Sequence, residues 1–254
     1  MEDRTRQLLA ERRNFMKSGF GLEREPSDQK KGLTQPPLFR HRTAIEKILL
    51  PEISDFNGFA EKDYFKLLQN RRSRRKYTGE AITLSQLAFL LWSVQGVRLY
   101  RENMTRTARP VPSAGARHPF ETYIQVNRVE GLLPGLYHYA PDENVLELIR
   151  QEADFERKSV ENLEEQIWTA KSSVIIYWTC DIYRSEYRYD TEAHRMSLVD
   201  LGHLDQNLYL SAEALGLGAC CIGAYGQQKC DDYLGVDGEG EFTVLAATVG
   251  QVNA

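Results

Sequence analysis

The sequence predicts an α+β protein, in which helices and strands follow one another without a repeated strand–helix–strand unit. The first observation is a meander, because residues 121–128, 136–139 and 145–149 have strand patterns and are separated by turn-forming residues. The second is a pair of helical segments, 83–95 before the meander and 192–217 after it. The third is that no Gly-x-Gly-x-x-Gly follows a predicted strand and no Walker motif occurs, which argues against a Rossmann or P-loop fold.

Length and composition allow one or two domains with a substantial core. The chain has 254 residues, of which 42% are hydrophobic. Its net charge of −4 disfavours general nucleic-acid binding, although residues 1–50 are basic, with 11 Lys and Arg against 7 Asp and Glu. No apolar run of about 18 residues predicts a membrane span. The charged N-terminus also lacks the apolar core of a signal peptide.

The cysteines predict reduced thiols in a cytoplasmic protein. They are Cys180, Cys220, Cys221 and Cys230, and three of them fall in apolar segments. No Cys-x-x-Cys spacing occurs, so a zinc site is not expected. Because Cys220 and Cys221 are neighbours, a vicinal redox pair stays open as an alternative.

The N-terminal part is expected to be an extension rather than part of the main domain. Residues 1–19 predict a charged helix with a thin apolar stripe. Residues 20–45 contain several Gly and Pro, which prevent a long regular element. An irregular segment of this length is usually functional. We therefore expect residues 1–58 to wrap a partner subunit and residues 59–254 to form the main domain.

Local sequence signals predict the first two helices of the main domain. Residues 60–70 predict a helix with three inward-facing apolar residues, Tyr64, Phe65 and Leu68. Thr83 and Gln86 form a capping box, in which each side chain satisfies a free amide at the start of the next helix. Gly96 ends that helix, and its apolar face is expected in the core.

The sequence from residue 98 onward predicts the remaining helices, strands and loops. Residues 98–120 are expected to form a loop before the meander, and residues 155–170 a helix after it. The apolar run 174–178 predicts a strand buried on both faces. After the long helix, the chain predicts a short strand or turn at 219–224, a short helix at 227–234 and a last strand at 242–247.

The most unusual stretch of the chain is Arg71-Arg-Ser-Arg-Arg-Lys76, with five cations in six positions around Ser73. Arginine binds phosphate oxygens through two parallel N–H groups, and a serine hydroxyl adds a further donor. The run therefore permits phosphate binding. Taken alone, it is equally typical of a solvated helix end, or of a localisation or RNA-binding patch.

Three other motifs contain small or polar residues, which would allow a ligand ring or a neighbouring helix to approach the backbone closely. In Pro112-Ser-Ala-Gly-Ala116 a flat ring could approach the backbone, although an ordinary loop has the same composition. Asp200-Leu-Gly-His-Leu-Asp-Gln-Asn207 allows tight helix packing, and His203 within it is compatible with a hydrogen-bonded interior residue. Cys221-Ile-Gly-Ala224 forms a turn whose amide could face a ring.

Taken in order, these motifs resemble those of the FMN-dependent nitroreductase superfamily over about residues 61–250. They are an R-x-S-x-R run, a P-S-A-G loop that opens a strand, a D-x-G-x-x-x-Q-N helix that ends in G-L-G, and an I-G turn. The first two motifs with their flanks look most like the SagB-type dehydrogenases, which include the azoline oxidases. The resemblance implies a central, mostly antiparallel sheet flanked by helices, in an intertwined homodimer.

The resemblance also implies an FMN cofactor at the dimer interface, ping-pong electron transfer, and NADH or NADPH as candidate electron donors. The substrate class would be a nitro compound or quinone, or a small molecule or peptide azoline to be dehydrogenated. By motif position, the residues that would hold the phosphate and ribityl chain are Arg71, Arg72, Ser73 and Arg75. Those that would line or flank the ring are Pro112, Ser113, Ala114, Gly115, Ala116, Gln206, Ile222 and Gly223.

The chain departs from this pattern at two places. Azoline oxidases carry a Lys-Tyr pair before the long helix, where this chain has Arg188 and Tyr189. Because arginine stays protonated, Arg188 is expected to orient a carboxylate or stabilise an anion, with Tyr189 as a proton donor or a packed aromatic. The sequence also ends without the basic segment that contacts the phosphate in many nitroreductases. The cluster from Arg71 to Arg75 is then expected to do more of that work, aided by Arg106, Arg109 and Arg117.

Two classes of function follow from these observations. One is an FMN-dependent oxidoreductase that acts on a small molecule, with neither nucleic acid nor membrane as a partner. The other is a flavin-binding partner protein of a larger complex, without turnover of its own. Reduction of the bound flavin by a nicotinamide nucleotide would distinguish the two.

Overall fold

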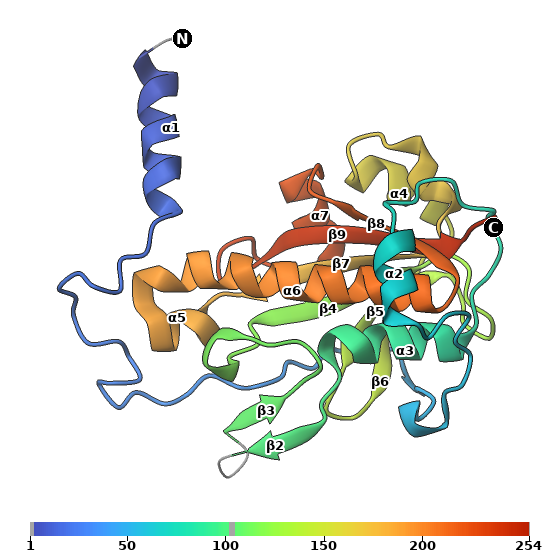
Figure 1. The fold of residues 1–254 in the computed structure, drawn as a ribbon, viewed down its shortest axis with the longest axis horizontal. Coiled ribbons are helices and arrows are strands. Elements are labelled where there is room, and N and C mark those ends of the chain that lie inside the picture. The colour runs from blue at the N-terminus through green and yellow to red at the C-terminus, as the bar shows by residue number, and fades with distance from the viewer. Residues whose placement is uncertain (1–2, 102–104, 254) are drawn as a thin grey trace.

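The computed structural model describes residues 3–101 and 105–253, and it confirms the predicted α+β architecture (Figure 1). Within these residues, seven strands form one antiparallel sheet in the order β1-β6-β5-β4-β7-β9-β8. The strands are β1 (Glu46–Leu49), β4 (Phe120–Val126), β5 (Gly135–Ala140), β6 (Val145–Gln151), β7 (Val174–Asp181), β8 (Leu217–Ile222) and β9 (Glu241–Gln251). The helices are α1 (Asp3–Phe15), α2 (Tyr64–Asn70), α3 (Leu84–Gln95), α4 (Phe155–Asn162), α5 (Tyr183–Tyr189), α6 (Ala193–Ala214) and α7 (Gln227–Leu234).

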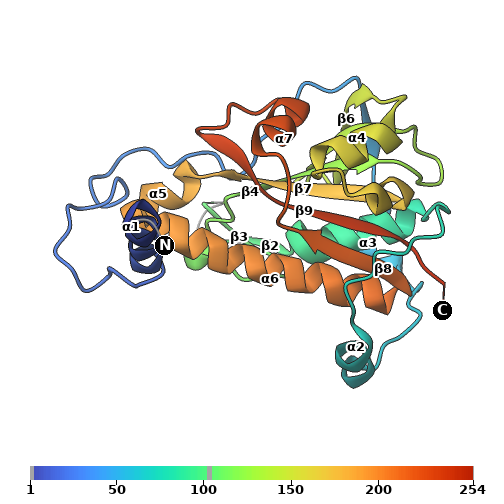
Figure 2. The ribbon, with the colours of Figure 1, turned by 90° about the horizontal axis from the view of Figure 1, so that it is seen from above.

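Helices cover both faces of the sheet (Figure 2). On one face α3 and α6 pack against Ile176 and Trp178 of β7. On the other face, α7 and the end of α4 lie over Ile175 and Tyr177. Successive side chains of a strand point to opposite faces, so a strand between two helical layers is apolar throughout. The predicted doubly buried strand is therefore confirmed as β7, and it is longer than its apolar run indicates.

The predicted meander is also confirmed. β4, β5 and β6 pair in sequence order, with Tyr123 opposite His138 and His138 opposite Glu147. The long α6, the short β8 and α7, and the last strand β9 lie where the sequence predicts them. Short turns and alternating side chains are local signals, which is why this part of the sheet follows from the sequence.

α3 begins with the predicted capping box. The Thr83 hydroxyl accepts from the Gln86 amide at 3.1 Å, and the Gln86 side chain accepts from the Thr83 amide at 2.9 Å. Leu87, Leu91 and Val94 on its inner face are fully buried. Gly96 caps the end of the helix with an ordinary negative φ, so it does not adopt the left-handed conformation of many glycine caps.

The prediction for residues 60–70 is wrong in its orientation. The helix forms as α2, but Tyr64, Phe65 and Leu68 are 64%, 66% and 48% exposed. Within α2 only Leu67 is buried. The apolar face predicted to point inward is thus presented to solvent in the single chain.

Two further boundaries differ from the predictions. The expected loop at 98–120 contains a hairpin of two short strands, β2 (Leu99–Arg101) and β3 (Arg106–Ala108). The expected helix at 155–170 breaks after α4, and its last part is the 3-10 helix η3 (Ile167–Lys171). Glu164 and Glu165 have φ of 52° and 59°, a left-handed conformation that an α-helix cannot contain.

The N-terminal extension contains the predicted charged helix α1, which projects away from the rest of the chain (Figure 1). Its apolar stripe is exposed, with Leu8 at 46% and Phe15 at 43%. The irregular segment that follows is tied to the sheet at Arg40, which contacts Asp181 at 2.6 Å, and at Arg42, which contacts Glu241 at 2.6 Å. Among the described residues, no helix combines the length and apolar character needed to cross a membrane.

Candidate active site

The basic run lies along the edge strand β8. Ser73 forms a parallel bridge with Ala219, and the Arg74 amide donates to the Ala219 carbonyl at 2.9 Å. Arg74 also pairs with Glu213 of α6 at 3.1 Å. The run is therefore a fixed segment of the fold rather than a loose charged end, and Arg74 is the cation within it that holds the segment to α6.

Tyr209 of α6 brings two of the predicted phosphate ligands together. Its hydroxyl lies 3.0 Å from the Ser73 hydroxyl and accepts from the Cys221 amide at 2.9 Å. The Arg71 guanidinium lies over the Tyr209 ring, 5.2 Å from its centroid. A cation above an aromatic face is held in place while its N–H groups stay available for a ligand.

The other two predicted arginines lie differently. Arg75 is exposed, and its guanidinium lies 5.8 Å from the centroid of Trp168. Arg72 donates to the carbonyl of Gln69 at 2.9 Å, at the end of α2. Arg72 thus caps a helix through its Nη1 atom, which the carbonyls at the end of α2 already engage.

The predicted turn that would face the ring ends β8. Ile222 is buried, whereas Gly223 is exposed and has no described atom within 4 Å of the place where a Cβ atom would lie. Ala219 and Gly223 are four residues apart along an extended chain, or about 13 Å. The phosphate-like and ring-like ends of the predicted site therefore lie along the same strand edge.

The Pro112–Ala116 loop is held by Asp200 of α6. The Asp200 carboxylate accepts from the Ser113 hydroxyl at 2.7 Å and from the Ala114 amide at 2.9 Å. The Ser113 oxygen in turn accepts from the His118 amide at 2.9 Å. Burial raises the pKa of Asp200, although these two donors oppose the shift. The carboxylate thus fixes the loop against the helix.

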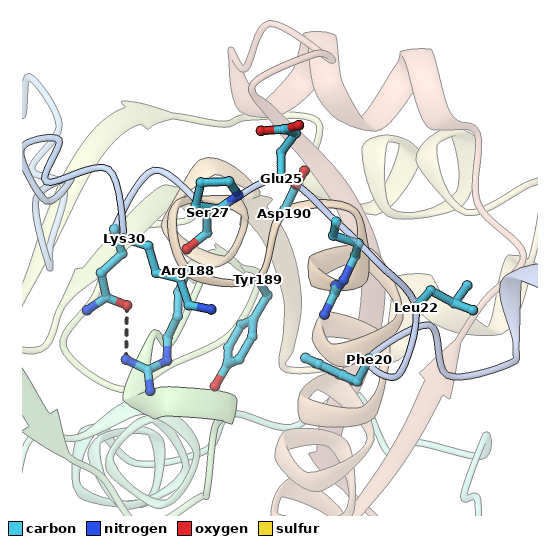
Figure 3. A pocket seen from close by; sticks show the side chains of 11 residues that line it. Phe20, Leu22, Glu25, Ser27, Lys30, Arg188, Tyr189 and Asp190 are labelled. Atoms are coloured by element: carbon cyan, nitrogen blue, oxygen red, sulfur yellow. Dashed lines mark hydrogen bonds between the residues drawn. The ribbon is translucent and has the colours of Figure 1, made fainter.

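The loop contacts the predicted catalytic pair at Gly115, whose φ is +57°. A Cβ atom there would lie 2.6 Å from both Arg188 Nε and the Tyr189 hydroxyl. Arg188 also donates to the Gln29 side chain at 3.0 Å, and the Tyr189 ring meets Phe20 edge-on. Both residues line a cavity of about 590 Å³ between α5 and the N-terminal segment (Figure 3). The structure therefore joins the Gly115 loop, Arg188 and Tyr189 in one place.

These two groups of residues lie on different sides of α6. Asp200, beside the Gly115 loop, and Tyr209, beside Ser73, are nine residues apart. On an α-helix that spacing corresponds to about 13 Å along the axis and about half a turn around it. Within one chain the basic run and the Gly115 loop are consequently not parts of one continuous surface.

Four predicted residues on or near these groups have plain structural surroundings. Gln206 is exposed on α6, and Asn207 donates to the Ser93 carbonyl at 2.7 Å, which packs α6 on α3. Arg109 is buried and bonds to Gln95, and burial lowers its pKa to about 10. Arg117 donates to the Gly115 carbonyl at 3.0 Å, so it belongs with that loop.

Sequence reasoning missed Tyr209, and it included Asp200 and Asp205 only as parts of a helix motif, without a contact to either group. Asp205 lies one helical turn before Tyr209 and accepts a hydrogen bond from the Cys221 thiol. Burial raises the Asp205 pKa to about 6, and the nearby Arg71 charge opposes that shift. A tyrosine within a helix has no local pattern that distinguishes it from an ordinary surface or core residue, and the motif around the two aspartates does not show what they contact, so only the tertiary contacts identify these roles.

Comparison with known proteins indicates the family to which this chain belongs. Residues 68–251 match the model of the nitroreductase family. The chain is 30% identical over 185 residues to the protein MJ1384 of Methanocaldococcus jannaschii, which is named as a nitroreductase; the match covers 73% of this chain and 89% of that protein. It is 33% identical over 114 residues to the trifolitoxin-processing protein TfxB of Rhizobium leguminosarum bv. trifolii, which covers 43% of this chain but only 30% of TfxB.

Solved structures show the same fold. A nitroreductase structure from Ralstonia eutropha has a TM-score of 0.67 and 25% identity, and the match covers 92% of this chain and all of that one. A chain of the Escherichia coli microcin synthetase complex McbBCD has a TM-score of 0.61 at 19% identity, covering 80% and 79%, a likeness in fold. The TfxB match is consistent with the SagB-type subgroup that the motifs resemble. The chain has the nitroreductase fold and belongs to the nitroreductase family.

Proposed function

We propose that this protein is an FMN-dependent oxidoreductase, a finer statement than the general flavin-dependent oxidoreductase activity that its family supports. The observation that carries the proposal is the fixed position of Arg71, Ser73 and Arg75 along β8, whose other end is the open turn at Gly223. A phosphate-binding end and a ring-binding end on one strand edge suit an elongated nucleotide.

The residues present fit the phosphate of FMN. Within the described residues, neither Arg71 nor Arg75 forms an ion pair, whereas Arg74 is paired with Glu213. Two guanidinium groups resting on aromatic rings and one hydroxyl leave donors for phosphate oxygens. Arg71, Ser73 and Arg75 would hold the phosphate and ribityl chain, and Arg72 would contribute charge from the helix end.

The residues at the ring end would position the flavin and a substrate. Bound FMN would supply the redox chemistry, while the protein supplies orientation and electrostatics. The Gly223 amide and Ile222 would meet one side of the ring, and the Pro112–Ala116 loop would line it. Tyr189 would donate a proton from its phenol oxygen, and Arg188 would stabilise an anion, since it lies against the same loop.

We propose further that two copies of the chain complete each site. The basic run and the Gly115 loop lie on opposite sides of α6, so a flavin that contacts both motifs takes them from different subunits. The exposed apolar faces of α1 and α2 suit burial in such a homodimer. Residues 1–58 would act as the wrapping extension and residues 59–254 as the flavin-binding domain.

The purified protein tests the cofactor directly. We expect flavin absorbance bands in the protein as isolated, or after addition of FMN. Replacing Arg71 or Arg75 by alanine is expected to weaken FMN binding roughly tenfold or more, because a charged hydrogen bond contributes about 1.5–3 kcal/mol. Lys76→Ala is the matched control, because Lys76 is an exposed cation of the same run without an assigned role. Protein that takes up no FMN, or variants that all behave alike, would contradict the proposal.

Turnover separates an enzyme from a flavin-binding partner protein. Anaerobic mixing with NADH or NADPH is expected to bleach the flavin absorbance, and a quinone or nitroaromatic is expected to restore it. Flavin that binds but is reduced by neither nucleotide would favour the partner protein instead.

A further inference from the structure

The cavity beside Arg188 and Tyr189 is a separate feature from the strand edge at which the flavin is proposed to bind. It has a volume of about 590 Å³ and lies between the end of α5 and residues 20–30 of the N-terminal extension (Figure 3). Cavities of several hundred Å³ are of the size that holds small organic ligands.

Hydrogen bonds fix the N-terminal wall of the cavity. The Gln29 amide donates to the Tyr187 carbonyl at 2.8 Å, and the Tyr183 hydroxyl donates to Asp28 at 3.1 Å. The Gly19 amide donates to Glu192 at 3.0 Å. Arg188 is held from the same wall through Gln29. The wall is thus docked on α5 near Asp28 and Gln29 and on Glu192, just before α6, near Gly19, so the cavity is a built feature of the chain.

Cations surround the inner end of this cavity. Arg24, Lys30 and Arg188 line it. Behind Arg188, the Arg117 side chain is 3% exposed, and its Nη2 atom is buried without a hydrogen-bond partner in the described part of the chain. Burial and the charges of Arg106 and Arg188 lower the Arg117 pKa, which indicates a locally positive potential.

The carboxylates of the cavity do not neutralise this end. Glu25 and Asp190 also line it, but in Figure 3 both project toward the upper rim, whereas the side chains of Arg188 and Tyr189 extend in the opposite direction. Arg188 hydrogen-bonds to a neutral amide, that of Gln29. A guanidinium without a carboxylate partner next to a cavity is suited to bind an anion from solution.

The same cavity has an apolar wall. Phe20 meets the Tyr189 ring edge-on with 6.1 Å between centroids, and Leu22 and Pro26 also line the cavity. Arg24 lies over the Phe20 ring, 4.9 Å from its centroid. A ligand held here would therefore place an apolar or aromatic group against Phe20 and a negative charge near Arg188.

We propose that this cavity binds an organic carboxylate with an apolar or aromatic body, with the carboxylate on Arg188 and Lys30. If the proposed flavin function holds, on which this last step rests, such carboxylates are the class of substrate presented to Tyr189 and the Gly115 loop. The N-terminal extension then acts as part of the substrate site as well as a subunit contact.

Benzoate and benzamide form a matched pair of probes, because they share the aromatic ring and differ in charge. Calorimetric titration of the protein as isolated is expected to give benzoate an affinity at least about tenfold higher than that of benzamide. Arg188→Gln should remove most of that preference, and raised salt should weaken it. Lys30→Gln, a substitution at an exposed position, should reduce the preference for benzoate several-fold. Arg157→Gln on α4, an exposed arginine paired with Glu161, should leave it unchanged.

Equal affinity for the two probes, or benzoate affinity that survives both Arg188→Gln and Lys30→Gln, would overturn the proposal. The result is independent of the flavin experiment, because calorimetry needs no turnover. Protein that binds FMN but not benzoate would reject the carboxylate site alone. Protein that binds benzoate but not FMN would keep the site and reject its role in flavin chemistry.

Discussion

At the scale of single residues, Gly115 determines whether the predicted catalytic pair can reach the loop. Its φ of +57° is favourable for glycine, and the space that a Cβ atom would occupy is filled by Arg188 Nε and the Tyr189 hydroxyl. The glycine is needed both for its backbone conformation and for the close approach of α5. These two requirements can be separated by experiment.

Gly115→Ala and Gly131→Ala form a matched pair. Gly131 has a φ of +78° but no described atom within 4 Å of a Cβ position. Both variants are expected to lose about 1–2 kcal/mol of unfolding free energy from left-handed strain. In addition, Gly115→Ala should weaken FMN and benzoate binding, because it displaces Arg188 and Tyr189. Urea unfolding and ligand titrations would measure both effects. Identical ligand affinities in the two variants would show that the contact has no role.

Sequence alone identified some of these residues and not others, for a physical reason. Arg71, Ser73 and Gly115 belong to contiguous motifs with unusual composition, so they can be recognised without a fold. Tyr209 matters because α6 crosses beside β8, and its neighbours in sequence carry no sign of that contact. Asp200 belongs to a recognised motif, but its contact with the Ser113 loop depends on the tertiary fold. Arg72 shows the opposite case, a motif residue whose donors satisfy the end of α2.

At the scale of elements, α6 presents an unexplained apolar face. Leu198 and Val199 are 52% and 47% exposed, and the exposed Gly202 one turn later has no described atom near its Cβ position. A helix face with large apolar residues beside a glycine is suited to close packing against another helix. The exposed Tyr64 and Phe65 of α2 have the same character.

Replacing Leu198 and Val199 together by glutamate is expected to convert a dimer into monomers. Burial of such side chains contributes about 1.5–3 kcal/mol each, and charges in the same contact would oppose association. Sedimentation velocity would measure the mass of each species. Leu133→Glu, at a 55% exposed turn residue, is the control and should remain dimeric. A wild-type protein that sediments as a monomer at all concentrations would contradict the proposed assembly.

Element predictions succeeded where the signal is local. The capping box of α3 and the turns of the β4–β6 meander use neighbouring residues only, and both are confirmed. Helical spacing placed Tyr64 and Phe65 on one face of α2, but the spacing contains no information on what covers that face. The break after α4 occurs at Glu164 and Glu165. Neither residue is a Gly or Pro, so the sequence contains no helix-breaking signal there.

At the scale of the whole molecule, the order of the strands could not be predicted, because β7 pairs with β4 and β9 across long stretches of chain. A buried ionic network spans β4, β5 and β6. His138 on β5 lies 2.9 Å from Glu121 on β4 and 3.0 Å from Glu147 on β6. Arg184 of α5 contacts Glu121, and His41 of the N-terminal extension contacts Glu147 at 3.0 Å. The network thus joins the sheet, α5 and the extension.

The network predicts how stability depends on pH. Burial opposes the charged forms, but the partners outweigh it and hold the pKa of both Glu121 and Glu147 at about 2. They also raise the His138 pKa, against its burial and the Arg42 charge. The depressed carboxylates stabilise the fold above their ordinary value of 4.5, and that stability is lost as pH falls toward 2. The raised histidine stabilises it below 6.5, and that stability is lost as pH rises through its folded pKa.

The stability that this network contributes should therefore be largest between about pH 4.5 and 6.5 and smaller on either side, which thermal unfolding across pH would measure. His138→Gln is expected to cost roughly 3–5 kcal/mol, because it leaves two buried carboxylates without their shared cation. The variant should also lose less stability than the wild type as the pH rises above 6.5. Part of that loss should remain, because Glu147 also raises the pKa of His41. His194→Gln, at an exposed position on α6, is the control and should retain the wild-type profile. A profile above pH 6.5 that is the same with and without His138 would mean that this histidine is not protonated in the folded protein.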